Sequence, residues 1–422
     1  MTLVRIPLDT PTRKAADVTL KKRGEVVARV DWERFRDEAT AARRETTENL
    51  DALVEEFARN ATASGMKVVR AADGEAACRA VMAEIGESPE IVIKSKSMVT
   101  EEIGLRHHME KLGFTVFETD LGEWIVQVRG ELPAHVTAPA IHLSTAEIAQ
   151  SLSGALGRTL PPEPKALAGA AIDHLAKPLR GARVGISGAN FLIAETGEIV
   201  VIENEGNAYF CTSAETNVVV TGIDKVIRAR RQLPPLLRVL TASATGQPQT
   251  VYTHVLGRPG GDGVRRTIVL VDNGRRDLVA GPYADAGRCI RCGACMVACP
   301  VFRQVSGHGY KTVYPGPIGI LVAPVLEPQA TPSDAPFYST LCGACSDICP
   351  VRIPISELIA RRREDLWKSG KTPAAVRQAV GLFRRAQGSG PSASIARRIL
   401  LAVLRHPALR RGVRVLRAGM RR

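Results

Sequence analysis

Two cysteine-rich runs constrain the fold of this chain more than any other feature. The first is CIRCGACMVACP at residues 289–300, and the second is LCGACSDICP at residues 341–350. The first run has the spacing C-x2-C-x2-C-x3-C-P, which is typical of loops that wrap cubane iron–sulfur clusters. Gly293 in this run allows close approaches of backbone N–H groups that a β-carbon would hinder. We therefore expect residues 280–355, which are dense in Cys, Gly and Pro, to be organised by bound clusters rather than by an apolar core.

The spacing also predicts how the two runs share their ligands. In the two-cluster arrangement, the last cysteine of each run serves the cluster that the other run wraps. We expect one [4Fe-4S] cluster to be bound by Cys289, Cys292, Cys295 and Cys349. The other cluster is expected to be bound by Cys299, Cys342 and Cys345.

The second run is one cysteine short, because Ser339 occupies the position three residues before Cys342. Three arrangements remain open for this cluster: a [4Fe-4S] cluster with one open or differently ligated iron, a [3Fe-4S] cluster, or a ligand lent by a partner. A serine hydroxyl is a poor ligand for soft iron–sulfur chemistry. We favour a [4Fe-4S] cluster with one unusual iron.

Zinc is the competing metal, because C-x2-C pairs also bind it. The seven clustered cysteines, the two Cys-Pro endings and the three-residue gap before each final cysteine favour iron–sulfur clusters. The two other cysteines, Cys78 and Cys211, lie far from these runs. We expect both to be small buried hydrophobic residues, with Cys211 as an alternative source of the missing ligand.

Composition indicates a globular protein of two or more domains. The chain has 422 residues, of which 45% are hydrophobic and 24% charged, so each domain can bury its own core. The N-terminus lacks the apolar stretch of a signal peptide, and no long apolar window is free of charge. We therefore expect a cytoplasmic protein, in which thiols stay reduced and clustered cysteines serve as metal ligands or redox groups.

Residues 61–278 have the pattern of an α/β domain. Helix-like segments alternate with short β-branched runs: MKVVRA, EIVIKSK, FTVFET, NVVVTG and TIVLVDN. This alternation predicts βαβ units and a largely parallel sheet. Thr196-Gly197 joins two strand-like runs and predicts a hairpin, whereas GRPGGDG at 257–263 predicts a surface loop. Before this domain, residues 31–60 predict one amphipathic, solvated helix.

Two polar segments of this domain are candidate binding sites. The segment from Lys94 to Glu102 follows a strand and opens a helix, so it could bind an anion, or it could simply cap the helix through Thr100. The segment from Glu203 to Asn207 ends a strand-like run and either lines a pocket or forms a turn.

The C-terminal tail carries the excess positive charge of the chain. The net charge is +14, and 14 Lys and Arg residues but no acid follow Asp365. The tail is helical in pattern, with breaks at 370–373 and 388–392 and an apolar stripe at Leu409, Val413, Leu416 and Met420. Such a tail could lie on an anionic membrane surface, bind an acidic partner or, less favourably, bind nucleic acid.

These motifs together resemble the lactate-utilisation iron–sulfur proteins of the LutB type. The resemblance covers roughly residues 30–360 and rests on KSKSMVTEEIGL, ETDLGEWIVQ, GISGANFLIAETGEIVVIENEGNA, GIDKVI, RCIRCGACMVACPV and LCGACSDICPVRIPI. It implies an α/β LUD-type domain similar to sugar-phosphate isomerases and CoA-transferases. It also implies a subunit of an L-lactate oxidation system that yields pyruvate, working with a cysteine-rich iron–sulfur protein and a second LUD-type protein. In that family the second run also lacks its first cysteine, so Ser339 matches the family pattern.

We therefore expect an N-terminal extension and helix (1–60), an α/β domain (61–278), a dicluster ferredoxin-like α-helical domain (279–360) and a basic helical tail (361–422). The expected role is to pass single electrons during oxidation of a 2-hydroxy acid, in the cytoplasm or at the inner face of the membrane. One alternative is that the α/β domain itself binds and oxidises a small 2-hydroxy acid, with the clusters as internal acceptor. A second alternative is a nucleic-acid-binding iron–sulfur protein.

Overall fold

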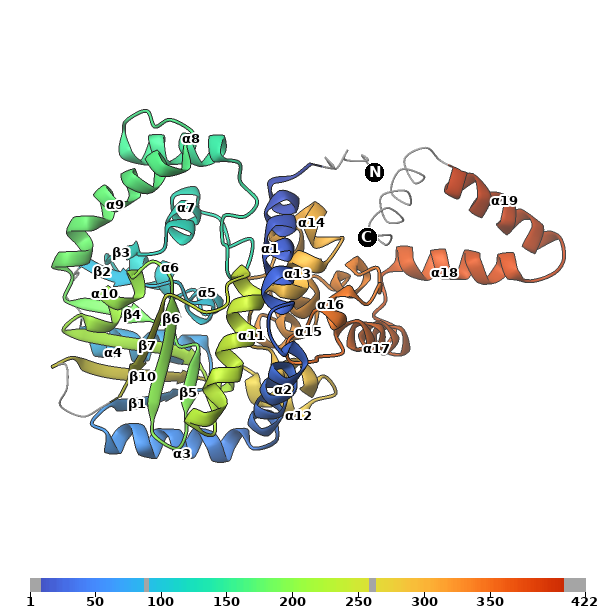
Figure 1. Ribbon diagram of the computed structural model, residues 1–422. Helices are drawn as coiled ribbons and strands as arrows, with labels where there is room; N and C mark the ends of the chain where they lie inside the picture. Colours follow the sequence, from blue (N-terminus) through green and yellow to red (C-terminus); the bar gives the residue numbers. More distant parts are fainter. Residues whose placement is uncertain (1–8, 87–90, 258–262, 406–422) are drawn as a thin grey trace.

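The computed structural model in Figure 1 describes residues 9–86, 91–257 and 263–405. Most of the predicted loop at 257–263 and the apolar stripe from Leu409 to Met420 lie outside the described residues.

A parallel sheet of six strands forms the centre of the α/β domain among the described residues. Its strand order is β1-β10-β7-β4-β2-β3, and every neighbouring pair is parallel. The strands are β1 (Lys67–Ala71), β2 (Ile91–Lys94), β3 (Thr115–Glu118), β4 (Val184–Ser187), β7 (Thr216–Gly222) and β10 (Arg265–Val271). The predicted strand runs and the parallel sheet are therefore confirmed.

Both faces of the sheet are buried, which explains its continuous β-branched runs. On β7, Val218 and Val220 pack into the core beneath α4 (Gly74–Ile85), whereas Val219 packs into the core beneath α3 (Leu50–Ala63). Other helices around the sheet are α5 (Met98–Glu102), α6 (Leu105–Lys111), α7 (Leu121–Arg129), α8 (Thr145–Leu156), α9 (Pro164–Gly181), α10 (Asn207–Ser213) and α12 (Arg275–Ala280). Several begin at side-chain caps; for example, Asp120 accepts from Glu123 N at 2.9 Å at the start of α7.

A smaller sheet, with four strands in the part of the chain that the structure describes, packs beside the first in the order β8-β5-β6-β9. Its strands are β5 (Phe191–Ile193), β6 (Glu198–Glu203), β8 (Val226–Ile227) and β9 (Tyr252–Leu256). The predicted hairpin at Thr196-Gly197 is confirmed, because β5 and β6 are antiparallel. Gly197 has φ +71°, and a β-carbon there would lie 2.2 Å from Ala61 N.

The N-terminal helices join the α/β domain to the cysteine-rich segment. Residues 31–60 form two helices, α2 (Trp32–Glu48) and α3, and not the single solvated helix that we predicted. That prediction is wrong because α2 packs between α11 (Leu233–Thr245) and the 3-10 turn η3 (Ala284–Arg288), with α1 (Pro11–Val27) beside it on α11. Figure 1 shows α1 and α2 along the boundary between the green and the orange parts of the chain.

Short helices hold the cysteine-rich segment. They are α13 (Ala294–Ala298), α14 (Phe302–Val305), α15 (Gly316–Leu326), α16 (Ala344–Asp347) and α17 (Ile355–Lys368). One continuous hydrophobic core includes six of the seven clustered cysteines together with Phe191, Val200 and Leu236 of the α/β domain.

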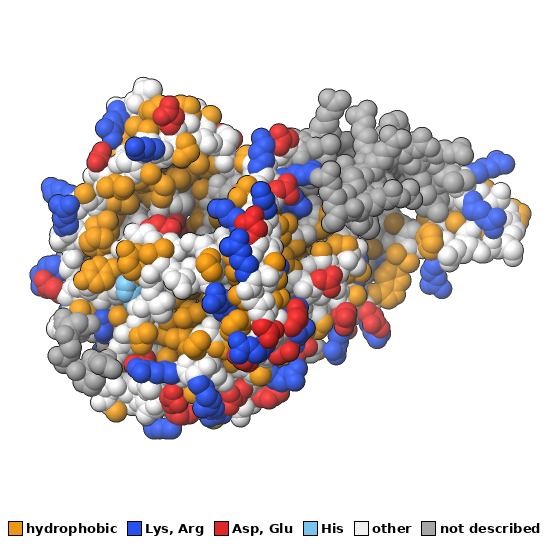
Figure 2. Space-filling model, viewed as in Figure 1, with side chains coloured by type: hydrophobic (Ala, Val, Ile, Leu, Met, Phe, Trp, Pro, Cys, Tyr) orange, Lys and Arg blue, Asp and Glu red, His pale blue; other side chains and the backbone are white. Residues whose placement is uncertain are grey.

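The described part of the tail forms a helical hairpin of α18 (Ala374–Gln387) and α19 (Pro391–Arg405). Both predicted helix breaks occur where expected, between α17 and α18 and between α18 and α19. The hairpin extends away from the rest of the molecule in Figure 1 and presents Lys and Arg side chains in Figure 2.

Candidate functional site

The two cysteine runs adopt the same local backbone. Arg291 (φ +60°) and Gly293 (φ +76°) of the first run correspond to Leu341 (φ +56°) and Gly343 (φ +87°) of the second. The left-handed conformation is costly for residues other than glycine, so its occurrence at both Arg291 and Leu341 indicates that the runs need this loop shape.

Ser339 occupies the place in the second loop that Cys289 occupies in the first. The backbone N–H of Arg291 donates to Cys289 Sγ at 3.4 Å. In the same relation, the N–H of Leu341 donates to Ser339 Oγ at 3.1 Å. The hydroxyl of Ser339 thus stands where the missing thiol of the second run would be.

The first group of sulfur atoms lines a single apolar cavity, as the spacing predicts. Its walls include Val136, Ile318 and Ile353, and its four thiols belong to Cys289, Cys292, Cys295 and Cys349. Cys349 comes from the second run, where Ile353 N donates to its sulfur at 3.4 Å. The structure therefore brings together the four residues that we expected to share a cluster.

The second group consists of Cys299, Cys342 and Cys345, and it reaches the protein surface at Cys342. Burial raises the pKa of Cys345 to about 12, and the adjacent Cys299 and Cys342 add to the rise. Cys299 accepts from Phe302 N at 3.5 Å and is also hydrogen-bonded by the Tyr310 hydroxyl. Cys342 is exposed, in contrast to the other clustered cysteines.

The electrostatics of the first group suit a thiolate-bound metal cluster. Burial raises the pKa of Cys292 and of Cys295, and repulsion from neighbouring thiolates adds to both shifts. For Cys349, burial raises the pKa to about 11. The raised pKa values mean that Cys292, Cys295 and Cys349 become thiolates only with strong positive charge among them, which iron supplies. The apolar walls and the N–H donors to sulfur also fit such a cluster.

Cys78 and Cys211 are buried elsewhere, which confirms that part of the prediction. Cys78 Sγ lies 3.5 Å from Ile103 O, and Cys211 Sγ lies 4.0 Å from Thr119 Oγ1. Because Cys211 packs on α10 against the main sheet, the structure does not bring it to the second sulfur group.

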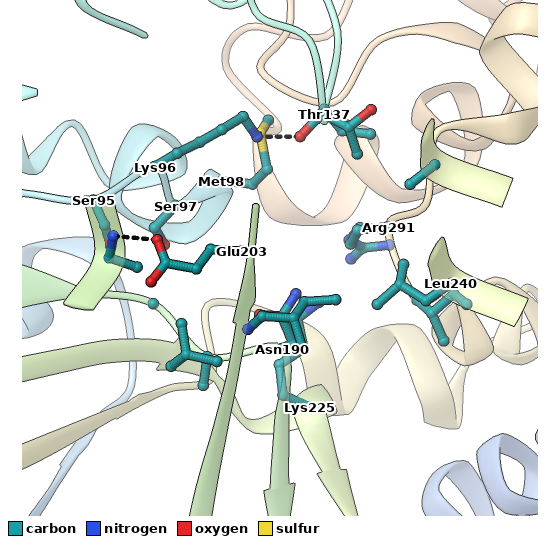
Figure 3. A pocket seen from close by; sticks show the side chains of 18 of the residues that line it. Ser95, Lys96, Ser97, Met98, Thr137, Asn190, Glu203, Lys225, Leu240 and Arg291 are labelled. Atoms are coloured by element: carbon teal, nitrogen blue, oxygen red, sulfur yellow. Dashed lines mark hydrogen bonds between the residues drawn. The ribbon is translucent and has the colours of Figure 1, made fainter. Parts of the chain in front are cut away.

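A second cavity adjoins the first sulfur group at the carboxyl ends of the parallel strands (Figure 3). Its volume is about 280 Å³. Residues at the ends of β2, β3, β4 and β7 line it: Ser95, Asp120, Gly188 and Thr221. This edge is where open α/β sheets commonly bind ligands.

Both polar segments that the sequence singled out contribute to this cavity. Residues 95–99 and 203–205 face it, together with Asn207. Lys94 does not, because it is buried in ion pairs with Glu118 at 2.7 Å and Glu101 at 3.0 Å. Thr100 does not cap the helix as expected, because it lies inside α5, where its hydroxyl donates to Ser97 O at 2.7 Å, and Ser97 is the N-cap residue.

The sequence pointed to Lys96 in this cavity but not to two of its other cations, Arg291 and Lys225. Arg291 lies inside the first cysteine run, and Lys225 ends the 3-10 turn η1 (Ile223–Lys225). Val136, Ile290 and Arg291 line both the second cavity and the sulfur cavity, so the two share a wall. The sequence signal that could have identified Arg291 is its position as a charged residue between Cys289 and Cys292, two cysteines that are expected to be cluster ligands.

Comparisons with known proteins agree with this architecture. The LUD domain family model matches residues 54–271, and the 4Fe-4S dicluster domain model matches residues 285–353. A protein of Escherichia coli (strain K12) named "Uncharacterized electron transport protein YkgF" is 39% identical over 83% of this chain and 76% of its own length. "Lactate utilization protein B" of Macrococcus caseolyticus is 38% identical over 86% of this chain and 77% of its own length. The same-named protein of Bacillus cytotoxicus is 36% identical over 84% of this chain and 76% of its own length.

The fold and the sulfur groups thus define an iron–sulfur protein that joins a LUD domain to a ferredoxin-type 4Fe-4S domain. Within that class, the chain belongs to the lactate utilization protein B family. In the described part of the chain, every helix is too short or too polar to cross a membrane.

Proposed function

We propose that this protein is the electron-transfer subunit of a system that oxidises L-lactate to pyruvate. The observation that carries the proposal is the arrangement of the two sulfur groups. One group is buried beside the cavity at the sheet edge, and the other reaches the surface through the exposed Cys342. Electrons that enter at the first sulfur group, beside the cavity, would leave to a partner through the second sulfur group. The names of the relatives support the lactate-utilisation context.

The proposed cofactors are two [4Fe-4S] clusters, which supply one-electron redox chemistry when bound. The first would be held by Cys289, Cys292, Cys295 and Cys349, and the second by Cys299, Cys342 and Cys345. N–H groups of Arg291, Phe302 and Ile353 point at three of these sulfurs and would stabilise their negative charge. The position of Ser339 in the second loop supports one iron without a cysteine ligand.

Cluster content tests this proposal on anaerobically purified protein. We expect Cys292→Ala and Cys345→Ala each to lower iron and sulfide by about half, because each removes a ligand of a different cluster. Cys78→Ala is the matched control and should retain both clusters. Colourless, redox-silent protein that carries zinc would refute the proposal. An electron paramagnetic resonance signal of an oxidised three-iron cluster would show that the second cluster is [3Fe-4S] and not the favoured [4Fe-4S].

The proposed partners are a cysteine-rich iron–sulfur protein and a second LUD-type protein. The exposed Cys342 of the second sulfur group supports docking of an electron-transfer partner. The basic tail supports contact with an acidic partner or an anionic membrane surface at the cytoplasmic face.

A second candidate function is that the α/β domain itself binds and oxidises a small 2-hydroxy acid. The cavity that shares a wall with the first sulfur group favours this candidate. Turnover of L-lactate by the isolated holoprotein with an artificial electron acceptor would support it. Reduction of the clusters only when partner proteins are present would support the first candidate.

A further inference from the structure

The cavity at the sheet edge has a cationic end with donors that lack partners. Arg291 is 8% exposed, and none of its three guanidinium nitrogens makes a hydrogen bond to the described residues. Its nearest carboxylate oxygen is Asp224 Oδ2 at 3.5 Å, and its guanidinium lies 4.8 Å from the centre of the Tyr314 ring. A buried guanidinium with unused donors is costly unless a ligand or water receives them.

Lys225 adds a second cation close to Arg291. Its ammonium makes no hydrogen bond or ion pair within the part of the chain that the structure describes. Burial lowers the pKa of Lys225 to about 8, with the adjacent Asp224 acting in the opposite direction and Arg291 adding to the fall. Each of these cations would therefore gain from an anion placed between them.

The carboxylates at this end are already engaged. Asp224 accepts from Arg275 at 2.8 Å, and Glu102 binds the same guanidinium through two bonds of 2.8 and 2.7 Å. Three cations, Arg275, Arg291 and Lys225, therefore face two carboxylates. A thiolate at Cys289 would be a further negative group near Arg291, so the unused hydrogen-bond donors of Arg291 favour a bound anion more strongly than the charge count does.

The opposite end of the cavity is acidic. Glu203 is occupied by the N–H groups of Ala208 and Tyr209 and by His254. Glu205 also lines the cavity, where burial and, next, the negative charge of Asp120 raise its pKa. Figure 3 shows Glu203 across the cavity from Arg291. A ligand that is anionic at both ends would be repelled here, whereas a hydroxyl group finds acceptors.

Resting on the proposed function, we infer that this cavity binds a small hydroxy or oxo acid whose carboxylate lies between Arg291 and Lys225. The neutral part of the acid points toward Asn190 and Glu205. Arg291 belongs to the loop that carries Cys289 and Cys292, so the bound acid lies directly against the wall of the first sulfur cavity.

Calorimetric titration of the anaerobic holoprotein with L-lactate, pyruvate and inorganic phosphate, each separately, tests the inference. We expect L-lactate or pyruvate to bind, and Lys225→Gln and Arg291→Gln each to weaken this binding about 10- to 100-fold, the loss of one hydrogen bond to a charged group. Lys177→Gln removes one charge from an exposed position on α9 and should leave binding unchanged. If Arg291→Gln loses its cluster, binding is measured instead on Arg291→Lys, which keeps the positive charge of the side chain.

Absence of binding by both organic acids, binding of phosphate alone, or unchanged affinity in Lys225→Gln would overturn the inference. Arg291 also lies near Cys289, so it could serve only to offset thiolate charge. In that case Arg291→Gln would shift the reduction potential of the cluster while Lys225→Gln left acid binding intact. Reduction of both clusters by dithionite, measured on the same samples, reports on the proposed function separately.

Discussion

Lys94 shows how a single buried charge in this protein is stabilised by specific partners. Its side chain is fully buried, and its ammonium contacts Glu118 and Glu101 at the end of β2. Burial alone would lower the pKa of Lys94, but these carboxylates raise it above its ordinary value. The sequence shows Lys94 itself, but it does not reveal the pairing with Glu118, because Glu118 lies on another strand, β3. The same limit applies to Arg291 and Lys225, which only tertiary packing brings together.

We expect Lys94→Met to lower the free energy of unfolding by about 3–5 kcal/mol, because it leaves the buried Glu118 with only the more distant Arg106, 3.9 Å away, as a counter-ion. The matched control is Lys67→Met, which removes an exposed pair with Glu84 and should cost about 0–1 kcal/mol. Denaturant unfolding followed by circular dichroism measures both. Equal, small losses in the two variants would contradict the prediction.

At the scale of elements, the sequence predicts best where local pattern and burial agree. The strands at β1, β2, β3, β7 and β10 and the hairpin at Thr196-Gly197 were all predictable, because period and turn chemistry are local. The strand order was not predictable, since the insertion of β10 between β1 and β7 depends on contacts between distant segments. Residues 31–60 were misread because an amphipathic pattern does not reveal the break at Asn49 or the neighbour that covers the helix.

The helical hairpin of α18 and α19 can be removed without opening the main core, because the two helices pack chiefly on each other. We expect a chain ending at Lys371 to keep its iron and its unfolding midpoint. If the tail binds anionic membranes, the same truncation should abolish flotation with phosphatidylglycerol vesicles. Flotation equal to that of the full chain would exclude this role for the tail.

At the scale of the whole molecule, Arg43 ties the α/β domain to the cysteine-rich segment. It is 1% exposed and donates to Asp224 O at 2.7 Å and Val226 O at 3.3 Å on one side. On the other side it donates to the carbonyl groups of Gly287 and Arg288, both at 3.1 Å. These two residues directly precede Cys289, so the first cysteine loop is anchored through a helix that the sequence suggested was solvated.

We expect Arg43→Met to remove a donor from each of these buried carbonyl groups, of which Val226 O still accepts from Thr46 Oγ1 at 2.8 Å, and to lower the free energy of unfolding by about 3 kcal/mol or more. Because the loop before Cys289 loses its anchor, the variant should also bleach faster in air than the unaltered protein. Arg44→Met on the exposed side of the same helix is the control. An unchanged bleaching rate in Arg43→Met would mean that the loop is held by other contacts.

The crossing of Cys349 into the cavity of the first run has a consequence for biosynthesis. With the proposed ligands, the second cluster lacks a sulfur donor until Cys345 has been translated, and the first cluster lacks one until Cys349. Iron delivery would therefore follow synthesis of most of the polypeptide, and a product terminated before Cys345 would remain metal-free.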